Sequence, residues 1–295
     1  MEYRVHHYEA FSPFPGRGNP AGVVLEGANL DDATMQAIAA RVGFNETAFV
    51  LPSATGDLRL RYFTPGHEID LCGHATVASL FALHDRRRLG EGDVTVETRA
   101  GLLPMAVRRA GHEVRIHMTQ APAQFVPFPG DRNAVATVLG ISVANLDPKL
   151  PIVFGSTGTW TLLVPVQGVA TLRAMHPQTA AFPSVLEPMP RSSIHPFCLE
   201  AEAADADLSA RHFSSPYSGT VEDPVTGTAS GVMAAYMATH AAPWMVDRND
   251  SLVVEQGKDV GRDGRVHVRL LNRHSPLHVQ IAGACCFVRD MEIEV

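Results

Sequence analysis

The clearest pattern along the chain is a segment in which nearly every position is apolar or small. From Ala75 to Leu83 no polar stripe recurs at helical spacing, and a helix that is apolar on all sides is normally buried because it has no face for water. The polar sequence Asp70-Leu71-Cys72-Gly73-His74 comes directly before it. The first turn of a helix carries free backbone N–H groups and the positive end of the helix dipole. The pattern therefore predicts a buried helix whose start can bind a carboxylate or another anion.

The rest of the first half alternates between apolar and polar positions in short runs, which is typical of strands. One amphipathic helix interrupts them, capped by Asp31-Asp32 and ended by Gly43. Pro13 to Pro20 has the composition of a turn-rich loop. The predicted strands are Tyr3–Phe11, Ala21–Leu25, Thr47–Leu51, Leu58–Phe63, Val94–Thr98, Leu102–Val107 and Val114–Met118.

The second half begins with a proline-containing connection, Thr119 to Asn133, and continues with a helix that starts at Ala134. Strand signals then return between Ile152 and Val166, whereas the proline-rich passage up to Pro196 has no clear assignment. The later predicted strands are Phe197–Ala201, Leu252–Gln256, Val266–Leu271, Leu277–Ile281 and Cys285–Val288.

An internal repeat links the two halves. Arg61-Tyr62-Phe63-Thr64-Pro65 precedes Gly73-His74-Ala75-Thr76 and the apolar helix, and Arg211-His212-Phe213-Ser214-Ser215 precedes Gly227-Thr228-Ala229-Ser230 and a second small, apolar helix. The repeat predicts two lobes built on one plan, each a sheet around a buried helix. We place them at residues 1–120 and 121–295, with the terminal strand, about residues 277–295, able to return to the first lobe. If the lobes face one another, both helix starts open on one cleft, where a small anionic ligand would bind.

Composition narrows the class of partner. The 295 residues are 45% hydrophobic and 19% charged, with a formal net charge of −7, so nucleic acid is not an expected partner because phosphate binding depends on clustered Lys and Arg. The apolar runs are too short to span a bilayer, and the N-terminus lacks a signal-peptide pattern. The four cysteines show neither metal-ligand spacing nor a disulfide framework. We expect a cytoplasmic protein without a metal site.

Three residues could move protons. His74 lies at the start of the first repeated helix and Asp223 in the loop four residues before Gly227, and a histidine and a carboxylate across a cleft can divide acid and base roles near neutral pH. Glu46 is a lone acid between an apolar helix and an apolar strand, where partial desolvation would raise its pKa. Each has an ordinary structural interpretation as well: a capping aspartate, a hydrogen-bonded histidine and an exposed turn glutamate.

Two further stretches have alternative interpretations. Gly18-Asn19-Pro20 is either a tight turn or a loop that presents Asn19 and backbone N–H groups to a ligand. Cys72 is either a small buried hydrophobe, which free cysteines usually are, or a nucleophile or racemase base. Dinucleotide, nucleotide and serine-hydrolase motifs are absent from the sequence.

Six short motifs, in order along nearly the whole chain, resemble those of the phenazine-biosynthesis PhzF-like family. They are Gly18-Asn19-Pro20-Ala21, Asn45-Glu46-Thr47-Ala48-Phe49-Val50, Arg61-Tyr62-Phe63-Thr64-Pro65, Asp70-Leu71-Cys72-Gly73-His74-Ala75-Thr76, Glu222-Asp223-Pro224-Val225-Thr226-Gly227 and Glu255-Gln256-Gly257. The resemblance implies an α+β, diaminopimelate-epimerase-like fold with two similar lobes, each a β-barrel-like mixed sheet around a central helix.

The resemblance also implies a cofactor-independent isomerase, which moves a proton between carbons of a small carboxylic acid, and commonly a homodimer. Glu46 takes the place of the family's catalytic glutamate, with His74 and Asp223 as its catalytic partners. The backbone at Gly73, Gly227 and Thr228 would hold the carboxylate. The expected substrate-binding residues are Gly18, Asn19, Gly73, Thr226, Gly227 and Thr228.

One position departs from the family pattern and leaves the substrate open. Thr228 stands where the family usually has serine; its added methyl narrows the site and puts the family's dihydro-hydroxyanthranilate substrate in doubt. The alternatives are an epimerase or racemase with Cys72 as one base, and a small-acid-binding protein without catalysis. Two-thiol racemisation is not expected, since the second lobe offers Asp223 and Val225 at the opposed position.

Overall fold

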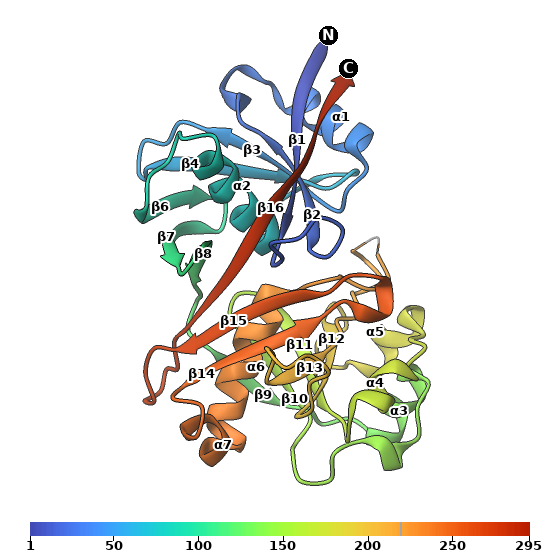
Figure 1. The fold of residues 1–295 in the computed structure, drawn as a ribbon. Coiled ribbons are helices and arrows are strands. Elements are labelled where there is room, and N and C mark those ends of the chain that lie inside the picture. Colours follow the sequence, from blue (N-terminus) through green and yellow to red (C-terminus); the bar gives the residue numbers. More distant parts are fainter. Residues whose placement is uncertain (219) are drawn as a thin grey trace. The chain divides into compact units, whose positions relative to one another are not determined.

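The chain folds into two compact units in a computed structural model that describes residues 1–218 and 220–295. The first unit comprises Met1–Thr119 together with Ala282–Val295, and the second comprises Gln120–Ile281. The lobes predicted from the sequence were residues 1–120 and 121–295, with a terminal strand that could return to the first. Figure 1 shows both units, and each is described here by itself.

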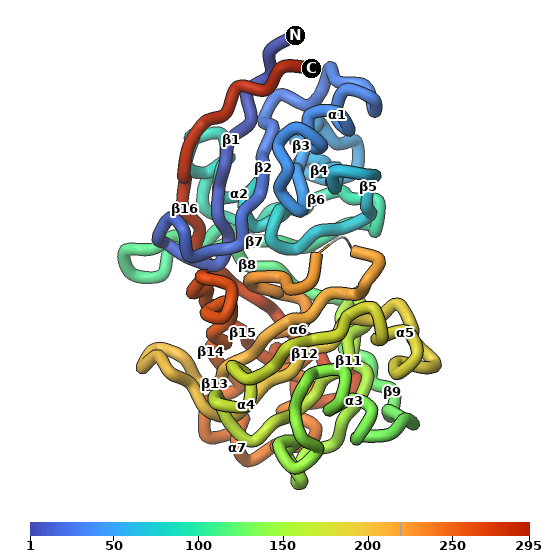
Figure 2. The backbone as a smooth tube through the Cα atoms, turned by 90° about the vertical axis from the view of Figure 1, so that its right-hand side faces the viewer, coloured from blue at the N-terminus to red at the C-terminus, as the bar shows by residue number. Residues whose placement is uncertain are grey.

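The first unit is a closed barrel of eight strands around one helix. Its strands follow the order β1-β2-β3-β4-β6-β7-β8-β16, and β16 pairs with β1 to close the ring. The two terminal strands therefore run side by side although they lie at opposite ends of the chain (Figure 2). The strands are β1 Glu2–Ala10, β2 Asn19–Val24, β3 Thr47–Leu51, β4 Leu58–Phe63, the short β5 Glu68–Ile69, β6 Gly92–Thr98, β7 Gly101–Ala110, β8 Glu113–Thr119 and β16 Val279–Glu294.

The helix inside this barrel is α2, Gly73–Asp85, and its residues from His74 to Leu80 are all buried. It packs against β1, β2, β3, β7 and β8. A second helix, α1 (Asp32–Val42), lies over another apolar cluster that includes Met35, Ile38 and Phe49. The buried helix predicted from the apolar run is confirmed.

The second unit repeats the plan of a sheet around a helix. Its central helix, α6 (Gly227–His240), is buried over most of its length and packs against β10, β14 and β15. Two backbone hydrogen bonds, from Gln120 N to Val279 O (3.0 Å) and from Ala123 N to Leu277 O (2.8 Å), join the segments next to the two ends of the sheet. The strands, in sheet order, are β15 Gly264–Leu270, β14 Ser251–Gln256, β13 Leu208–Ala210, β12 Ser193–Cys198, β11 Trp160–Pro165, β10 Val153–Ser156 and β9 Gln124–Pro127.

Three of the smaller helices of the second unit lie beside a large apolar cluster that includes Phe154, Phe182 and Phe213, whereas the last of them packs against α6. The helices are α3 Arg132–Leu139, α4 Val169–Arg173, α5 Phe182–Val185 and α7 Ala242–Val246, and the 3₁₀ turns of the chain are Gly27–Asn29, Val143–Asn145, Thr179–Ala181 and Lys258–Val260. The α+β fold class, with similar sheet-and-helix lobes, is confirmed.

Several predicted element bounds were wrong, each for a local reason. Asn19 and Pro20 belong to β2 and pair with Ala10 and Glu9, so the predicted loop ends earlier. The predicted connection from Thr119 contains β9, which pairs with β10. The strand predicted at Phe197–Ala201 is β12, Ser193–Cys198; it runs through Pro196, whose carbonyl accepts a hydrogen bond from Arg211 N at 3.0 Å.

The two last predicted strands are one strand, β16. The sequence Ala282-Gly283-Ala284 resembles a break between them, but Gly283 is needed inside the strand because the ring of Phe11 lies where its side chain would begin. A Cβ atom at Gly283 would come within 2.3 Å of Phe11 Cδ1.

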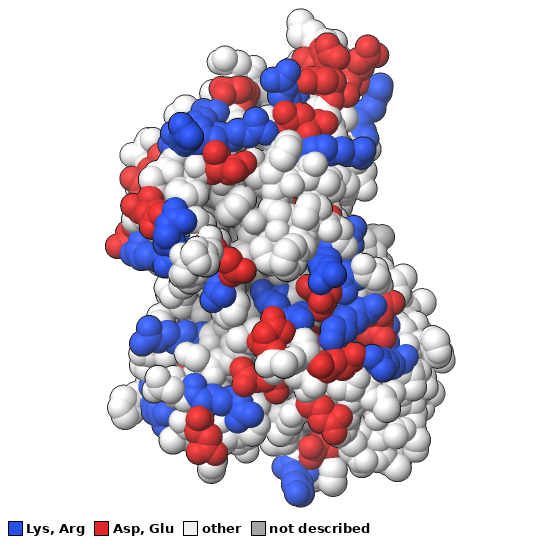
Figure 3. All heavy atoms as spheres, viewed as in Figure 1, with Lys and Arg blue, Asp and Glu red and all other residues white. Residues whose placement is uncertain are grey.

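Two further properties are the distribution of charge on the surface and the length of the helices. On the face shown in Figure 3, basic and acidic side chains are interspersed. In the described part of the chain, no helix is both long and apolar enough to cross a membrane.

Candidate functional site

Glu46 and His74 contact one another in the first unit. Glu46 Oε2 lies 3.2 Å from His74 Nε2, and the side chains are 19% and 8% exposed, respectively. Glu46 precedes β3, whereas His74 is the second residue of α2. The fold therefore places a nearly buried carboxylate against a buried imidazole at the start of the central helix.

The position of Glu46 is set by the chain on both sides of it. Helix α1 ends at Gly43, which adopts a left-handed conformation (φ 72°) that glycine accommodates without strain. The carbonyl of Glu46 then accepts a hydrogen bond from Gly22 N at 3.2 Å. Gly22 allows this close approach of β2, since a Cβ atom there would lie 2.8 Å from Thr47 Oγ1. Glu46 thus belongs to a fixed junction, not to a free turn.

The start of α2 is held by Thr76. Its hydroxyl donates to the carbonyl of Cys72 at 2.7 Å and lies 2.6 Å from the hydroxyl of Tyr62, which is fully buried. Cys72 Sγ lies 3.5 Å from His74 Nδ1. His74 therefore faces a thiol with one ring nitrogen and a carboxylate with the other.

These neighbours change the protonation of His74 and Cys72. Burial opposes a charge on His74, but Cys72 and Glu46 together raise the pKa of His74 well above its ordinary value. Burial, reinforced by the negative charge of Glu46, raises the pKa of the Cys72 thiol. A thiol whose pKa is raised is a poor base near neutral pH.

The predicted substrate-binding residues Gly18 and Asn19 lie at the end of a loop in the first unit that Glu9 holds. The carboxylate of Glu9 is 2% exposed and accepts hydrogen bonds from Gly16 N (2.7 Å) and Gly18 N (3.1 Å). A side chain at Gly18 would collide with Ala10 O, 2.5 Å from its Cβ position. Asn19 is fully buried as the first residue of β2.

In the second unit, Asp223 and Thr226 form a closed loop before α6. Thr226 Oγ1 donates to Asp223 Oδ2 at 2.5 Å. The buried side chain of Gln256, at the end of β14, accepts from Thr226 N at 3.1 Å and donates to Asp223 O at 2.8 Å. Asp223 N also donates to His212 O at 3.0 Å. The loop before α6 is thus fixed by side-chain and backbone bonds together.

Two glycines allow the strands beneath this loop to approach it. Gly257 has a positive φ of 106° and would place a Cβ atom 2.7 Å from Pro224 O; at Gly264 a Cβ atom would lie 2.3 Å from Val225 Cγ2. Gly227 and Thr228 follow as the first residues of α6, and the carbonyl of Thr228 accepts a hydrogen bond from Thr157 Oγ1 at 3.2 Å. The helix start is consequently well defined.

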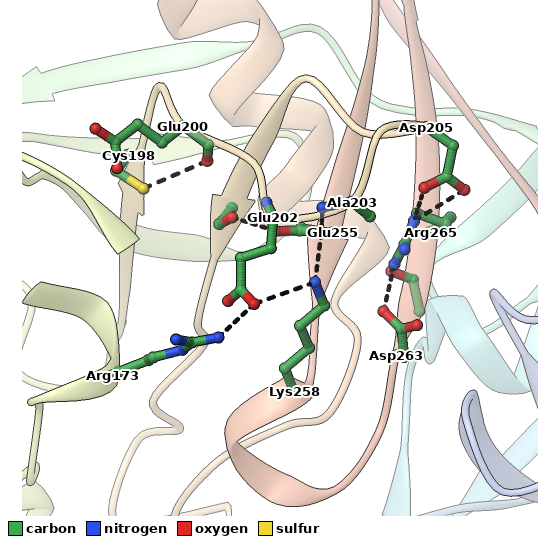
Figure 4. Close-up of polar contacts among 12 residues, drawn as sticks. Arg173, Cys198, Glu200, Glu202, Ala203, Asp205, Glu255, Lys258, Asp263 and Arg265 are labelled. Atoms are coloured by element: carbon green, nitrogen blue, oxygen red, sulfur yellow. Dashed lines mark hydrogen bonds and ion pairs between the residues drawn. The ribbon is translucent and has the colours of Figure 1, made fainter. Parts of the chain in front are cut away.

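Glu255, the residue before Gln256, stabilises the strand rather than the loop. Glu255 is 2% exposed and accepts hydrogen bonds from Glu202 N (2.7 Å), Ala203 N (3.0 Å) and Lys258 Nζ (2.9 Å). Figure 4 shows these contacts with Lys258, which also lies 3.6 Å from Glu202. The hydrogen bonds hold the pKa of Glu255 below its ordinary value against the effect of burial, the larger single influence. Glu255 therefore anchors the strand that carries Gln256.

The predicted site residues thus form two groups. Glu46, Gly73 and His74 lie together in the first unit, which also contains Gly18 and Asn19, while Asp223, Thr226, Gly227 and Thr228 lie together in the second. The supporting roles of Glu9 and Gln256 were not predicted. Gln256 belonged to one of the six family motifs, and Glu9 was an acidic residue within a predicted strand. Each was therefore noticeable in the sequence, but the sequence did not identify the groups to which it hydrogen-bonds.

Comparisons with known proteins agree with this arrangement. The family described as phenazine biosynthesis-like protein (PhzC-PhzF) matches residues 8–291. An uncharacterised isomerase of Bacillus subtilis is 46% identical, with 97% of each chain covered. A trans-2,3-dihydro-3-hydroxyanthranilate isomerase of Pseudomonas aeruginosa is 31% identical, with 90% of each chain covered.

A solved structure is also similar to this chain over its whole length. The crystal structure of a Bacillus anthracis phenazine biosynthesis protein of the PhzF family has a TM-score of 0.94 and 45% sequence identity, with both chains covered completely. The chain belongs to the phenazine biosynthesis-like (PhzC-PhzF) family and is an isomerase or epimerase of that family.

Proposed function

We propose that the protein is a cofactor-independent isomerase that moves a proton between two carbons of a small carboxylic acid, with Glu46 as the base and then the acid. The observation that carries the proposal is the contact of 3.2 Å between Glu46 Oε2 and His74 Nε2 at the start of a buried helix. A carboxylate that is largely withdrawn from water, next to a hydrogen-bond donor, suits proton transfer near neutral pH.

In the proposed reaction Glu46 removes a proton from an acidic carbon of the substrate. The C–H bond breaks, an O–H bond forms on Glu46, and the electron pair spreads into the conjugated, enolate-like system. The backbone N–H groups at Gly73 and the positive end of the α2 dipole favour that negative charge. Protonated Glu46 then returns the proton to a second carbon, which restores its carboxylate. His74, as an imidazolium, orients Glu46 and donates a hydrogen bond.

The remaining site residues stay predictions in this proposal. Asp223 would share the proton transfers, and Gly18, Asn19, Thr226, Gly227 and Thr228 would hold the substrate. A homodimer and a cytoplasmic location also remain predictions. The first substrate to test is trans-2,3-dihydro-3-hydroxyanthranilate, which the name of the Pseudomonas aeruginosa relative gives. Because Thr228 adds a methyl group where the family usually has serine, smaller unsaturated carboxylic acids are the second set to test.

The decisive experiment follows deuterium incorporation into these acids in D2O by mass spectrometry. We expect Glu46→Gln to lower the rate of incorporation by about 10²–10⁴-fold, the range of a positioned acid or base. Glu91→Gln is the matched control, because Glu91 belongs to the same unit but pairs with Arg109 at the surface. That control should exchange at the rate of the unmodified protein.

Three other outcomes would reject the proposal. Exchange that is unchanged in Glu46→Gln would remove the assigned role of Glu46. Exchange that depends on Cys72 but not on Glu46 would favour an epimerase with Cys72 as one base. Binding of an acid without exchange at any of its carbons would favour a binding protein without catalysis.

A further inference from the structure

Glu46, Cys72 and His74 bring three kinds of metal-ligand atom together in one unit. A carboxylate oxygen, a sulfur and an imidazole nitrogen lie within 4.8 Å of one another, although the residues come from two separate segments of the chain. We propose that these three side chains bind a thiophilic divalent cation such as Zn²⁺, and that the bound cation inhibits the enzyme. This site was not predicted from the sequence, because the cysteines have no metal-ligand spacing.

The interatomic distances fit one cation bound through His74 Nε2. This nitrogen lies 3.2 Å from Glu46 Oε2 and 3.9 Å from Cys72 Sγ. In a tetrahedral zinc site, bond lengths of 2.0–2.3 Å separate nitrogen from oxygen by about 3.4 Å and nitrogen from sulfur by about 3.6 Å. Both observed distances are within a few tenths of an ångström of these values.

The surroundings of the three atoms also favour a cation. Cys72 and His74 are 7% and 8% exposed, respectively. Glu46 Oε2 is buried and has no hydrogen bond within the described part of the chain, its approach to His74 being an ion-pair contact. A metal ion between the three groups would satisfy this oxygen. Three protein ligands leave the fourth position of zinc open for water or a substrate carboxylate.

The donor set selects among metals. Sulfur and imidazole ligands suit Zn²⁺, Co²⁺ and Cd²⁺, whereas Mg²⁺ prefers oxygen ligands in octahedral geometry. On binding, the Cys72 thiol and the His74 imidazolium each release one proton to water, and the sulfur and Nε2 form bonds to the metal. Binding therefore needs no oxidant or further reactant.

The inhibitory part of the proposal rests on the proposed function. The oxygen lone pair through which Glu46 would bind the cation is the one that would accept the substrate proton. A cation at this position would also replace the ion-pair contact between His74 and Glu46. Metal binding itself can be measured without any substrate, which keeps the two proposals separable.

The test is a titration of the full chain with Co²⁺, followed by its sulfur-to-metal charge-transfer absorption, with Zn²⁺ as the competitor. We expect the band in the unmodified protein, its displacement by Zn²⁺, and no effect of Mg²⁺. Cys72→Ser should abolish the band, and His74→Gln should weaken binding by about tenfold or more. The double variant Cys285→Ala/Cys286→Ala is the matched control, since it removes the other two thiols of the same unit and should retain the band.

Absence of the band in the unmodified protein, or its persistence in Cys72→Ser, would overturn the proposed site. A second measurement then addresses inhibition: deuterium incorporation with and without Zn²⁺, restored by EDTA. A charge-transfer band without inhibition would reject the inhibitory role and keep the site. If no acid exchanges at all, the proposed function fails while the metal site stands on its spectrum.

Discussion

The side chain of Gln256 makes two hydrogen bonds with Thr226. Its oxygen accepts from the backbone N–H of Thr226 and its nitrogen donates to the hydroxyl, both at 3.1 Å. A third bond, to the carbonyl of Asp223 at 2.8 Å, completes the clamp. One buried amide thus sets the loop that carries the predicted catalytic aspartate and leads into α6.

We expect Gln256→Ala to lower the free energy of unfolding by about 1–3 kcal/mol, because it leaves buried polar groups of the loop without their partner. If the loop holds substrate, KM should rise more than kcat falls. Urea denaturation and steady-state kinetics measure the two effects. Gln256→Glu, which keeps an acceptor for Thr226 N, should recover part of the lost stability.

A matched control separates this role from a general effect of glutamine. Gln124 lies exposed on β9 of the same unit, so Gln124→Ala should change neither stability nor KM. Equal losses of stability in the two variants would contradict a positioning role for Gln256. A loss of stability in Gln256→Ala without any change in KM, measured at a temperature at which the variant is folded, would contradict it as well.

In the first unit, Glu9 fixes a loop by hydrogen bonds, as Gln256 does in the second. Because its buried carboxylate accepts hydrogen bonds from both Gly16 N and Gly18 N, Glu9→Ala should destabilise the protein by about 1.5–3 kcal/mol, the range for hydrogen bonds to charged groups. We also expect faster hydrogen exchange at the Gly18 amide. Unaltered protection of that amide in Glu9→Ala would argue against the role.

The sequence predicted the parts of the fold that depend on local pattern. The apolar run from Ala75 and the repeat at Gly227 identified both central helices, because burial on all sides leaves a direct signature in composition. Closure of the barrel was not predicted in the same way. The pairing of β1 with β16 joins opposite ends of the chain, and strand alternation does not specify a partner.

The candidate site, like the fold, was predicted from the sequence only in part. On local sequence Glu46 was a candidate for proton transfer but was more typical of an exposed turn, and the family resemblance made it the main catalytic candidate. The contact between Glu46 and His74 depends on how β2 approaches the junction at Gly22. The partners of Glu9 are backbone N–H groups, which have no signature in the sequence.

Gly264 provides a test of close packing beneath the Asp223 loop. An added methyl group in Gly264→Ala would lie 2.3 Å from Val225 Cγ2, and Val225 is fully buried. We expect a loss of about 1–3 kcal/mol in stability, as for other overpacked cores. Gly66→Ala is the control, since nothing lies within 4 Å of its Cβ position.

A double variant tests whether the collision with Val225 causes the loss of stability in Gly264→Ala. Val225→Ala removes the two methyl groups against which the new side chain collides. Gly264→Ala should therefore cost less in the Val225→Ala background than in the unmodified protein, with a coupling of about 0.5–3 kcal/mol in the double-mutant cycle. Strictly additive losses would indicate another cause.

His195 and His212 form a buried pair beneath the same loop. Their Nδ1 atoms lie 3.2 Å apart, and the side chains belong to residues that are 0% and 9% exposed. Burial lowers the pKa of His212 to about 4. Burial also lowers the pKa of His195 well below its ordinary value, and a charge on His212 would lower it further. Both imidazoles are therefore neutral in the folded protein near pH 7.

This pair makes the folded protein sensitive to acid. The unfolded chain takes up protons at histidines near pH 6.5, whereas His212 in the folded state does so only near pH 4. The folded state binds fewer protons between these values, so the free energy of unfolding falls as the pH is lowered through this window. The slope is about 1.4 kcal/mol per pH unit for each histidine, and above about pH 6.5 the effect vanishes.

Urea denaturation from about pH 7.5 down to about pH 4.5 measures this slope. Replacing the titrating imidazole in His212→Gln should reduce the slope by about 1.4 kcal/mol per pH unit, whatever the variant costs in stability at pH 7.5. His112→Gln is the control, because His112 is an exposed residue of the other unit, and its slope should match that of the unmodified protein. A slope that His212→Gln leaves unchanged would show that acid acts through other groups.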